Sequence, residues 1–540
     1  MSYVRFQSFI FKGFSLLLLI PVLGFQGCKD ESIIPVTPIP LITEKSVVFN
    51  DIKALAGPFS FAKTMDQIVA TSYGAPTSSV SMLKSVIHSL AEDSFVHPIT
   101  GKTIAVTSRP LESTLDPKNL LNPDSRDGMI PVGLFNRFDL APADGSNCGE
   151  YRIVYAKRKG GDTDRMTMIF EARVPNPNPS KGLAGCVAIT DFWAQRSNDT
   201  DSTQTVTELE KFYYQGISGV EPVVKAENYG LPLGQLRVNL FKTPDLRQIK
   251  WALREFLVSF DQSGQAIFKP EPVDDSPIAA LFREAAALPA GFNEADQSDF
   301  RNVFLGQSLC NLVNPDRLSK NASAKDIING ISAGYDPRFN DFESISQGDE
   351  DNPAANTDPQ LLDQVQTRLT ALTDLSGVSR EQLMNRAGTM TCGGCHDFSA
   401  GKELGNGATW PGKSFSFVHI DENGQLSPLL KDFFIPRRVQ IAQQFKKDRK
   451  PFQQTAATCP GVVSTSKSAM IPNVSKAREH DLYKDVDIVR NQIQQIAQEP
   501  ETAEKSEKLK TILPDLKAAT DLARQLESAT GGAYTPARTH

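Results

Sequence analysis

Four segments between residues 130 and 270 constrain the fold more than any other feature of this 540-residue chain. Residues 150–158, 165–174 and 234–241 alternate apolar and polar side chains, which is typical of strands that are half-buried. The fourth segment, 251–260, is a short apolar run that fits either a strand or a buried helix. We therefore expect an antiparallel sheet with helices inserted between its strands.

Helical periodicity occurs both before and after this strand-rich region. The segment "SREQLMNRAGTM" opens with a capping box, in which Ser379 and Gln382 each satisfy a free backbone N–H group. Apolar residues at helical spacing or strong helix formers predict further helices. The predicted helices cover residues 79–95, 202–217, 276–315, 360–375, 379–390 and 436–447.

The expected fold class is α+β, because the strand-rich part and the later helical part are separate in the sequence. We predict an N-terminal strand-rich module with inserted helices, of unknown role, followed by a linker, a mainly α-helical domain and a helical C-terminal tail. The linker is acidic, contains proline and has no hydrophobic pattern. The predicted segments are 46–345 for the module, 346–360 for the linker, 361–475 for the helical domain and 476–540 for the tail.

The N-terminus has the features of an export signal. Arg5 and Lys12 precede the apolar run "GFSLLLLIPVLGF", which is long enough for a signal peptide and too short for a comfortable membrane span. The run leads to Gly27 and Cys28, a pair that resembles the lipidation site of bacterial lipoproteins. We predict a signal peptide over residues 1–27, lipidation of Cys28 and a proline-containing tether over 28–45.

This prediction places the chain in the cell envelope, anchored to a membrane by lipid. Lys29, which follows the cysteine, favours the outer membrane over the inner one. The alternative is an uncleaved signal anchor. The net charge of −6 gives no basic surplus for binding phosphates, so we expect no nucleic-acid partner.

Export also changes what the seven cysteines are expected to do. After Cys28 and the closely spaced pair Cys392 and Cys395, four remain, and an even remainder in an oxidising compartment suggests two disulfides. We expect the pairs Cys148–Cys186 and Cys310–Cys459. The sequence permits other pairings, and buried free thiols are the alternative.

The segment around residues 137–150 carries several charged side chains that could serve acid–base chemistry. Its spacing matches no hydrolase pattern, so Arg137, Asp139, Asp144 and Glu150 are expected to cap turns and form surface ion pairs. We assign no catalytic residue from the sequence.

The pentapeptide CGGCH, from Cys392 to His396, is the strongest chemical motif in the chain. Two thiols separated by two residues can each bond to a vinyl group of one haem, and the adjacent histidine can then bind the iron. Three alternatives remain: a redox dithiol, half of a zinc site, and a structural pair. The predicted helix before the motif argues against a thioredoxin-like dithiol, which requires a strand there, and no second CxxC or HxxxH supplies further zinc ligands.

The motif resembles the haem-attachment site of c-type cytochromes, and the resemblance is limited to about residues 378–412. It implies one covalently bound haem c, held by Cys392 and Cys395, with His396 as the proximal iron ligand. It also implies a cytochrome c-like fold for the helical domain. The sixth iron ligand stays open between Met470, His419, another residue and an open position. Arg437 and Arg438 are expected on a solvated helix face.

Three classes of function follow from these features. The first is a lipid-anchored, monohaem c-type cytochrome that transfers electrons in the envelope to a partner protein. The second is a non-redox envelope lipoprotein that binds a ligand, with CGGCH serving a structural role. The third is an oxidoreductase whose N-terminal module contains the active site.

Overall fold

The computed structural model describes most of the chain between residues 41 and 452, and residues from Pro40 onward are grouped in one compact unit. The predicted signal peptide, Cys28, Cys459 and Met470 lie outside the described residues, as does nearly all of the predicted tail. The described residues are 41–97, 100–157, 159, 163–230, 233–242, 251–261, 263–273, 277–283, 288–313, 322–332, 335–346, 352–372, 378–412, 419–452, 496, 507–508 and 511–512.

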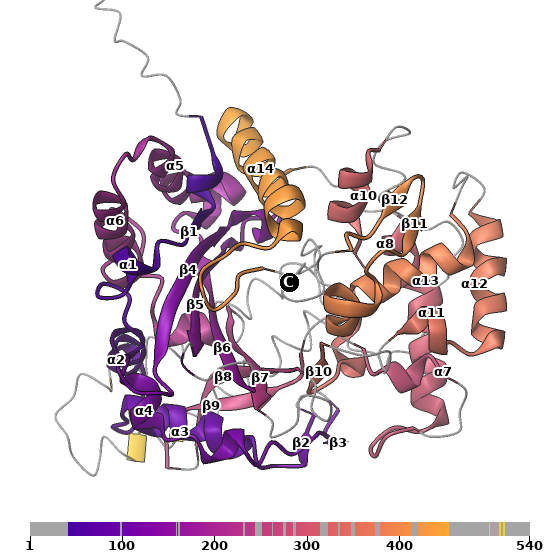
Figure 1. Cartoon of the computed structure of the whole chain (residues 1–540), viewed down its shortest axis with the longest axis horizontal. Coiled ribbons are helices and arrows are strands. Elements are labelled where there is room, and N and C mark those ends of the chain that lie inside the picture. The colour runs from indigo at the N-terminus through magenta and orange to yellow at the C-terminus, as the bar shows by residue number, and fades with distance from the viewer. Residues whose placement is uncertain are drawn as a thin grey trace, which may run out of the picture. The chain divides into compact units, whose positions relative to one another are not determined.

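An eight-stranded sheet forms the centre of the described structure (Figure 1). The strand order is β1-β4-β5-β6-β7-β8-β10, with β9 also paired to β8, and every pairing is antiparallel. This confirms the predicted antiparallel sheet, and the ambiguous run 251–260 is strand β8. The strands are β1 Val48–Phe49, β4 Met129–Arg137, β5 Asn147–Lys157, β6 Asp164–Pro175, β7 Gln235–Lys242, β8 Ala252–Phe260, β9 Ala266–Glu271 and β10 Ser344–Ile345.

Helices from the first half of the chain cover one face of this sheet. Their apolar sides and the strand residues Tyr151, Ile153 and Phe170 form one hydrophobic core. The predicted helices at 79–95 and 202–217 are confirmed as α3 and α6, although α3 ends at Ser89. These helices are α1 Ile52–Leu55, α2 Phe61–Thr71, α3 Ser79–Ser89, α4 Pro117–Leu121, α5 Val187–Gln195 and α6 Ser202–Tyr214.

Helices from the second half of the chain build a second core. This core joins Val132, Phe135 and Val154 of the sheet to Leu383 of α13 and Leu430, so it contains residues from both sides of the predicted linker. The linker segment itself contains α11 and the start of α12. The elements are α7 Glu294–Val303, α8 Leu309–Val313, α10 Ala324–Gly330, α11 Pro353–Asn356, α12 Pro359–Ala371, α13 Arg380–Thr389 and α14 Ile435–Asp448, with π-helical turns η9 Phe304–Ser308, η11 Gly394–Phe398 and η12 Leu430–Phe434.

The helix predictions of this half hold with one exception. Segments 360–375, 379–390 and 436–447 form α12, α13 and α14, and the capping box of Ser379 and Gln382 is present. The first part of 276–315 was expected to be helical, but its described residues contain only a 3₁₀ turn, Ala279–Leu281. The alanine-rich sequence favours a helix locally. In the structure, however, the Ile278 N–H donates a hydrogen bond to the Phe339 carbonyl oxygen, and the chain is extended there.

Short elements complete the described structure. Two hairpins pair β2 Ser94–Val96 with β3 Thr103–Ala105 and β11 Glu403–Gly405 with β12 Ala408–Thr409. Asn406 and Gly407, between β11 and β12, both have positive φ, as a tight two-residue hairpin turn requires. The remaining 3₁₀ turns are Glu44–Ser46, Glu112–Thr114, Phe138–Leu140, Pro179–Cys186, Arg196–Asn198, Ala226–Tyr229 and Pro337–Phe339.

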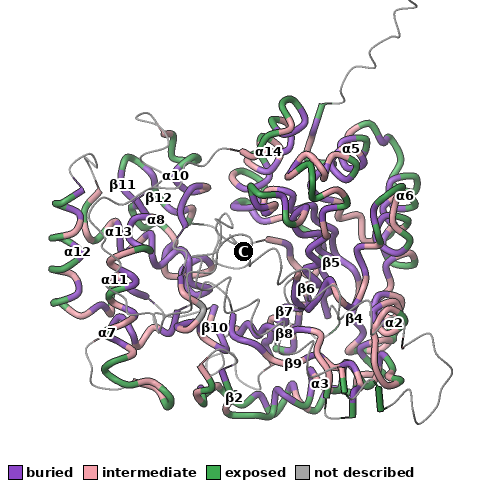
Figure 2. The backbone as a smooth tube through the Cα atoms, turned by 180° about the vertical axis from the view of Figure 1, so that it is seen from behind, coloured by how far each residue is buried: buried purple, intermediate pink, exposed green. Residues whose placement is uncertain are grey.

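Strands β4 and β5 are buried on both faces, and buried residues predominate along β4–β8 in Figure 2. Along β5 the side chains of Tyr151, Ile153 and Tyr155 enter the first core, whereas those of Glu150 and Arg152 point to the opposite side and are still enclosed. The polar face of the sheet is therefore inside the protein.

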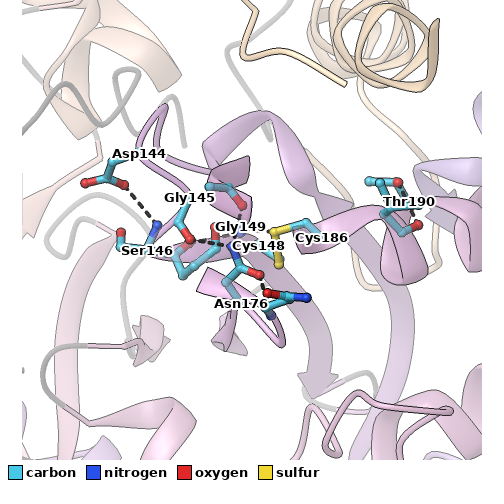
Figure 3. Close-up of a disulfide and its surroundings, with 12 residues drawn as sticks. Asp144, Gly145, Ser146, Cys148, Gly149, Asn176, Cys186 and Thr190 are labelled. Carbon is cyan, nitrogen blue, oxygen red and sulfur yellow. Dashed lines mark hydrogen bonds between the residues drawn. A yellow bond between two sulfur atoms is a disulfide. The ribbon is translucent and has the colours of Figure 1, made fainter. Parts of the chain in front are cut away.

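A disulfide joins Cys148 in β5 to Cys186 at the start of α5, which confirms this predicted pair (Figure 3). Asn176 lies beside it and donates hydrogen bonds to the carbonyl oxygens of Gly145 (2.6 Å) and Gly182 (2.8 Å). Closing a loop of this length restricts the unfolded chain and stabilises the fold by about 4 kcal/mol in the chain-entropy model. Cys310 is disulfide-bonded too, while the predicted partner Cys459 lies outside the described residues.

Within the described ranges, no helix is both long enough and apolar enough to cross a membrane.

Candidate functional site

The CGGCH motif begins a new helical turn directly after α13. Met390 and Thr391 separate the two, and the Thr391 hydroxyl accepts a hydrogen bond from the Gly394 N–H (3.0 Å) while donating to the Gly388 carbonyl (2.9 Å). The turn continues as the π-helical segment η11, which carries Cys395 and His396. π-Helical turns are frequent at functional sites.

Gly394 is required by the way this turn passes α13. A Cβ at this position would lie 1.8 Å from the carbonyl oxygen of Gly388 and 2.9 Å from the Phe398 ring. Any larger residue would push the turn away from the helix. The second glycine of the motif is therefore explained by packing within the protein.

The two cysteines of the motif are buried thiols with different surroundings. Cys392 packs with Leu253 of β8 and Val273, whereas Cys395 belongs to the second core, where Trp410 Nε1 donates to its carbonyl oxygen (3.4 Å). Burial, together with the neighbouring Cys392, raises the pKa of the Cys395 thiol well above its ordinary value. A redox-active dithiol needs a lowered thiol pKa, so this environment disfavours the dithiol interpretation.

His396 is neutral at physiological pH. Burial of the imidazole lowers the pKa of His396 to about 4. The neutral ring, with a free lone pair on one nitrogen, is the form that binds metal ions.

The motif lies on the wall of a large cavity between η11 and the polar face of the sheet. Its empty space is about 1,110 Å³, a value that includes the part open to solvent. Cys392, His396 and His419 all line it, while Cys395 lines a separate small cavity beside Trp410. The remaining lining residues are Phe135, Arg137, Arg152, Val154, Arg165, Thr167, Ile169, Glu171, Arg237, Asn239, Trp251, Leu253, Ser346, Ile420, Asp421, Glu422 and Arg438.

His419 is thus brought to the same cavity as the motif, 23 residues further along the chain. Its ring centre lies 6.0 Å from that of Phe434, and its carbonyl oxygen accepts a hydrogen bond from the Ser427 N–H (2.8 Å). Of the two predicted candidates for the sixth ligand, His419 lies at the cavity and Met470 lies outside the described residues.

A ladder of alternating charges crosses four strands on the opposite wall. Arg152 contacts Glu150 (2.7 Å) and Glu171 (3.0 Å), and Arg237 contacts Glu171 (3.2 Å) and Glu255 (3.0 Å). All five side chains are at most 7% exposed. The sheet register creates the ladder, because Arg152 is directly opposite Glu171 and Arg237 is directly opposite Glu255.

The arginines around the ladder favour the ionised form of Glu150. Burial alone would raise the pKa of Glu150, but the guanidinium groups of Arg152 and Arg173 outweigh this effect and lower the pKa to about 2. Asp139 is similar: burial opposes ionisation, and Arg137 and Arg438 hold the pKa of Asp139 below its ordinary value.

The predictions for this charged region were partly wrong. Asp144 does cap an exposed turn, accepting a hydrogen bond from Ser146 N–H (2.9 Å). Arg137, Asp139 and Glu150, however, form enclosed ion pairs, because later parts of the chain cover the polar face of the sheet. Arg438 is only 4% exposed and lines the cavity, where a solvated helix face was expected.

Sequence reasoning missed Glu171, Arg237 and Glu255 altogether. A signal for Glu171 was present as a Glu-x-Arg pattern in two successive strands, "EYR" at 150–152 and "EAR" at 171–173. Such alternation normally indicates a solvent-facing strand surface, so it gave no reason to expect a cavity.

Arg165, Glu422 and Trp251 also line the cavity, and they are more exposed than the ladder residues. Arg165 donates to Glu422 (2.6 Å), and its guanidinium carbon lies 4.8 Å from the centre of the Trp251 ring. A side chain from β6 is thereby tied to the loop that contains His419. Among the residues that the structure describes, no three His, Cys, Asp or Glu side chains converge as a metal site.

Comparison with protein-family models, curated proteins and solved structures finds no match for this chain. The chemistry must therefore be argued from the cavity itself. His396, His419 and Cys392 place two imidazoles and one thiol at the lining of this cavity, whereas the second thiol of the motif, Cys395, lines the separate cavity beside Trp410.

Proposed function

We propose that this chain is a monohaem c-type cytochrome-like protein that transfers electrons in the cell envelope. Cys392 and Cys395 would attach the haem through thioether bonds, and His396 would be the proximal iron ligand. The observation that carries the proposal is that Cys392, His396 and His419 line one cavity. Haem supplies one-electron chemistry by changing the oxidation state of its iron.

The surroundings of the motif favour haem over the other interpretations of CGGCH. The raised pKa of the Cys395 thiol opposes a dithiol mechanism. The motif borders a large cavity, whereas a purely structural turn has no need of one. The neutral His396 is ready to bind a metal ion.

We propose His419 as the sixth ligand, because it is the candidate that lines the cavity. Two imidazole ligands give a lower reduction potential than a histidine–methionine pair. The chain's own contribution is to hold the His396 imidazole neutral, to limit water access with Phe135 and Ile420, and to set the local charge with the arginine-rich wall.

The cellular setting is part of the same proposal. A signal peptide over residues 1–27 and lipidation of Cys28 would tether the protein in the envelope, with the outer membrane favoured. A redox partner protein would exchange electrons at the haem edge. The confirmed disulfide Cys148–Cys186 supports an oxidising compartment, where such bonds persist.

Absorption spectroscopy of the full-length chain tests the haem. Protein made in a bacterial host with a haem c maturation system should carry haem that survives denaturation and show the sharp reduced bands of thioether-linked haem. Replacing both Cys392 and Cys395 with serine should abolish covalent haem while leaving the Cys148–Cys186 disulfide intact. A folded but colourless wild-type protein would overturn the proposal and favour a non-redox lipoprotein.

The sixth ligand has its own test. His419→Ala should change the haem spectrum and the reduction potential, because one axial ligand is lost. His88→Ala is the matched control, since His88 is an exposed residue on α3 away from the cavity. Equal spectra for His419→Ala and wild type would exclude His419 and leave Met470 or an open position.

A further inference from the structure

Arg438 is a buried cation whose nearest acid is already engaged elsewhere. Its guanidinium lies 4.0 Å from Asp139, and among the described residues no carboxylate is closer. Asp139 instead accepts two short hydrogen bonds from Arg137, from Nε (3.0 Å) and from a terminal nitrogen (2.9 Å). Arg438 is nevertheless only 4% exposed and lines the cavity.

The arginines of this wall differ in how closely they contact an acid. Each carboxylate of the ladder is contacted by at least one arginine of the sheet at 3.4 Å or less, whereas Arg438 of α14 lies 4.0 Å from its nearest carboxylate. The arginines are Arg137, Arg152, Arg173, Arg237 and Arg438, and the acids that contact them are Asp139, Glu150, Glu171 and Glu255. Asp421 also borders the cavity, but its carboxylate accepts hydrogen bonds from the Asn423 (2.9 Å) and Gln425 (2.7 Å) N–H groups of its own loop.

The environment of Arg438 is unfavourable for its own charge. Burial and the like charge of Arg137 lower the pKa of Arg438 well below its ordinary value, and the attraction of Asp139 compensates only in part. An arginine keeps its proton in proteins, so an additional negative group in the cavity would stabilise the Arg438 guanidinium.

Apolar side chains lie next to the arginines on the same face of the sheet. Phe135 is two residues from Arg137 on β4, and Val154 is two residues from Arg152 on β5, so each pair shares one face. The cavity therefore presents a guanidinium group and an adjoining apolar surface. This combination suits a small molecule with a carboxylate and an apolar body.

We propose that the cavity binds a small organic acid, whose carboxylate is held by Arg438 and whose apolar part lies against Phe135 and Val154. The planar guanidinium can donate two parallel hydrogen bonds to a carboxylate. The inference concerns the same cavity as the haem proposal, but it rests on the sheet wall and on α14 and not on the CGGCH motif.

Calorimetric titration with benzoate tests this inference on the mature full-length chain as it is isolated. At constant ionic strength, wild-type protein should bind benzoate saturably and inorganic phosphate more weakly, since phosphate lacks an apolar body. Arg438→Gln should weaken benzoate binding by about tenfold or more, because a charge-assisted hydrogen bond pair is lost. Arg437→Gln is the matched control: this neighbour contacts Asp326 (3.9 Å) and the Phe452 ring, and does not line the cavity.

Two further variants keep the test decisive. If Arg438→Gln fails to fold, Arg438→Lys retains the charge but not the paired geometry, and it should bind benzoate less tightly than Arg437→Gln does. The Cys392→Ser/Cys395→Ser variant, which cannot attach haem covalently, is titrated in parallel. Its titration shows whether Arg438 binds a free acid or the carboxylates of an attached haem. Benzoate binding by this variant but not by the mature protein would overturn the proposal. Equal benzoate affinities of Arg438→Gln and Arg437→Gln would also overturn it, and so would the absence of saturable benzoate binding by wild type.

Discussion

One face of the central sheet packs Tyr151, Ile153 and Phe170 against helices, whereas the other presents Arg152, Glu171 and Arg237 to a cavity. Both faces are shielded from solvent. The apolar face stabilises the fold in proportion to the area that it removes from water. Enclosed ion pairs, in contrast, add little net stability, because desolvation of the charges offsets their attraction.

This difference indicates what each face is for. An apolar cavity wall of similar volume would serve stability as well as the charged ladder does. The ladder therefore points to a task inside the cavity, where charges are more effective than in water because the dielectric constant is lower. Three experiments would break or sharpen the comparison.

The largest effect is expected on the apolar face. Phe170→Ala removes a ring that contacts Phe61, Tyr155, Tyr229 and Phe268 in the first core. We expect it to lower the free energy of unfolding by about 4 kcal/mol, measured by chemical denaturation, because a large cavity remains. Val96→Ala, at an exposed residue, should change it by about 0.5 kcal/mol or less. Comparable losses in the two variants would mean that this face is not a packed core.

The charged face should respond next most strongly to removal of a single partner. Glu171→Gln removes the carboxylate that forms ion pairs with both Arg152 and Arg237. We expect the free energy of unfolding to fall by about 3 kcal/mol, because buried cations lose a partner. Lys211→Ala is the control, because its ion pair with Glu208 is exposed and should contribute about 0.5 kcal/mol or less. If both changes are equally small, the ladder is solvated and the cavity is open to bulk water.

Acid should weaken the charged face and spare the apolar one. The pKa of Glu150 is lowered from 4.5 to about 2, so the stability that it contributes is complete above pH 4.5 and is lost as the pH falls toward 2. Between pH 7 and pH 3 this loss amounts to about 2 kcal/mol. The free energy of unfolding, measured by denaturation at pH 7 and pH 3, should change by about 2 kcal/mol less in Glu150→Gln than in wild type. An identical pH dependence would mean that Glu150 has an ordinary pKa.

The sequence predicts the strands and most helices because these follow from local patterns. Alternation in 150–158 predicts β5, and the capping box at Ser379 predicts the start of α13. The pair Cys148–Cys186 also follows from nearness in one strand-rich region. The motif Cys392–His396 is recognisable because five consecutive residues carry its chemistry.

The cavity was not predictable, since distant segments assemble it. His419 and Arg438 approach the sheet only because α14 and the loop before it fold back over residues nearly 300 positions earlier. A charged strand face looks the same in the sequence whether water or protein covers it. Gly394 illustrates the same limit, because its close contact with Gly388 depends on the angle between two helical segments.

The fold-back of α14 has a consequence for the order in which the protein folds. A chain that emerges from its N-terminus completes β4–β8 long before residue 438 appears, so the first core can form early around local hairpins. The charged face must stay hydrated during that interval. Docking of α14, which pairs Lys446 with Asp191 at 2.7 Å and adds Phe445 to the first core, would then cover this face. Folding intermediates of this protein should therefore expose charge, which keeps them soluble, where most proteins of this size expose apolar surface.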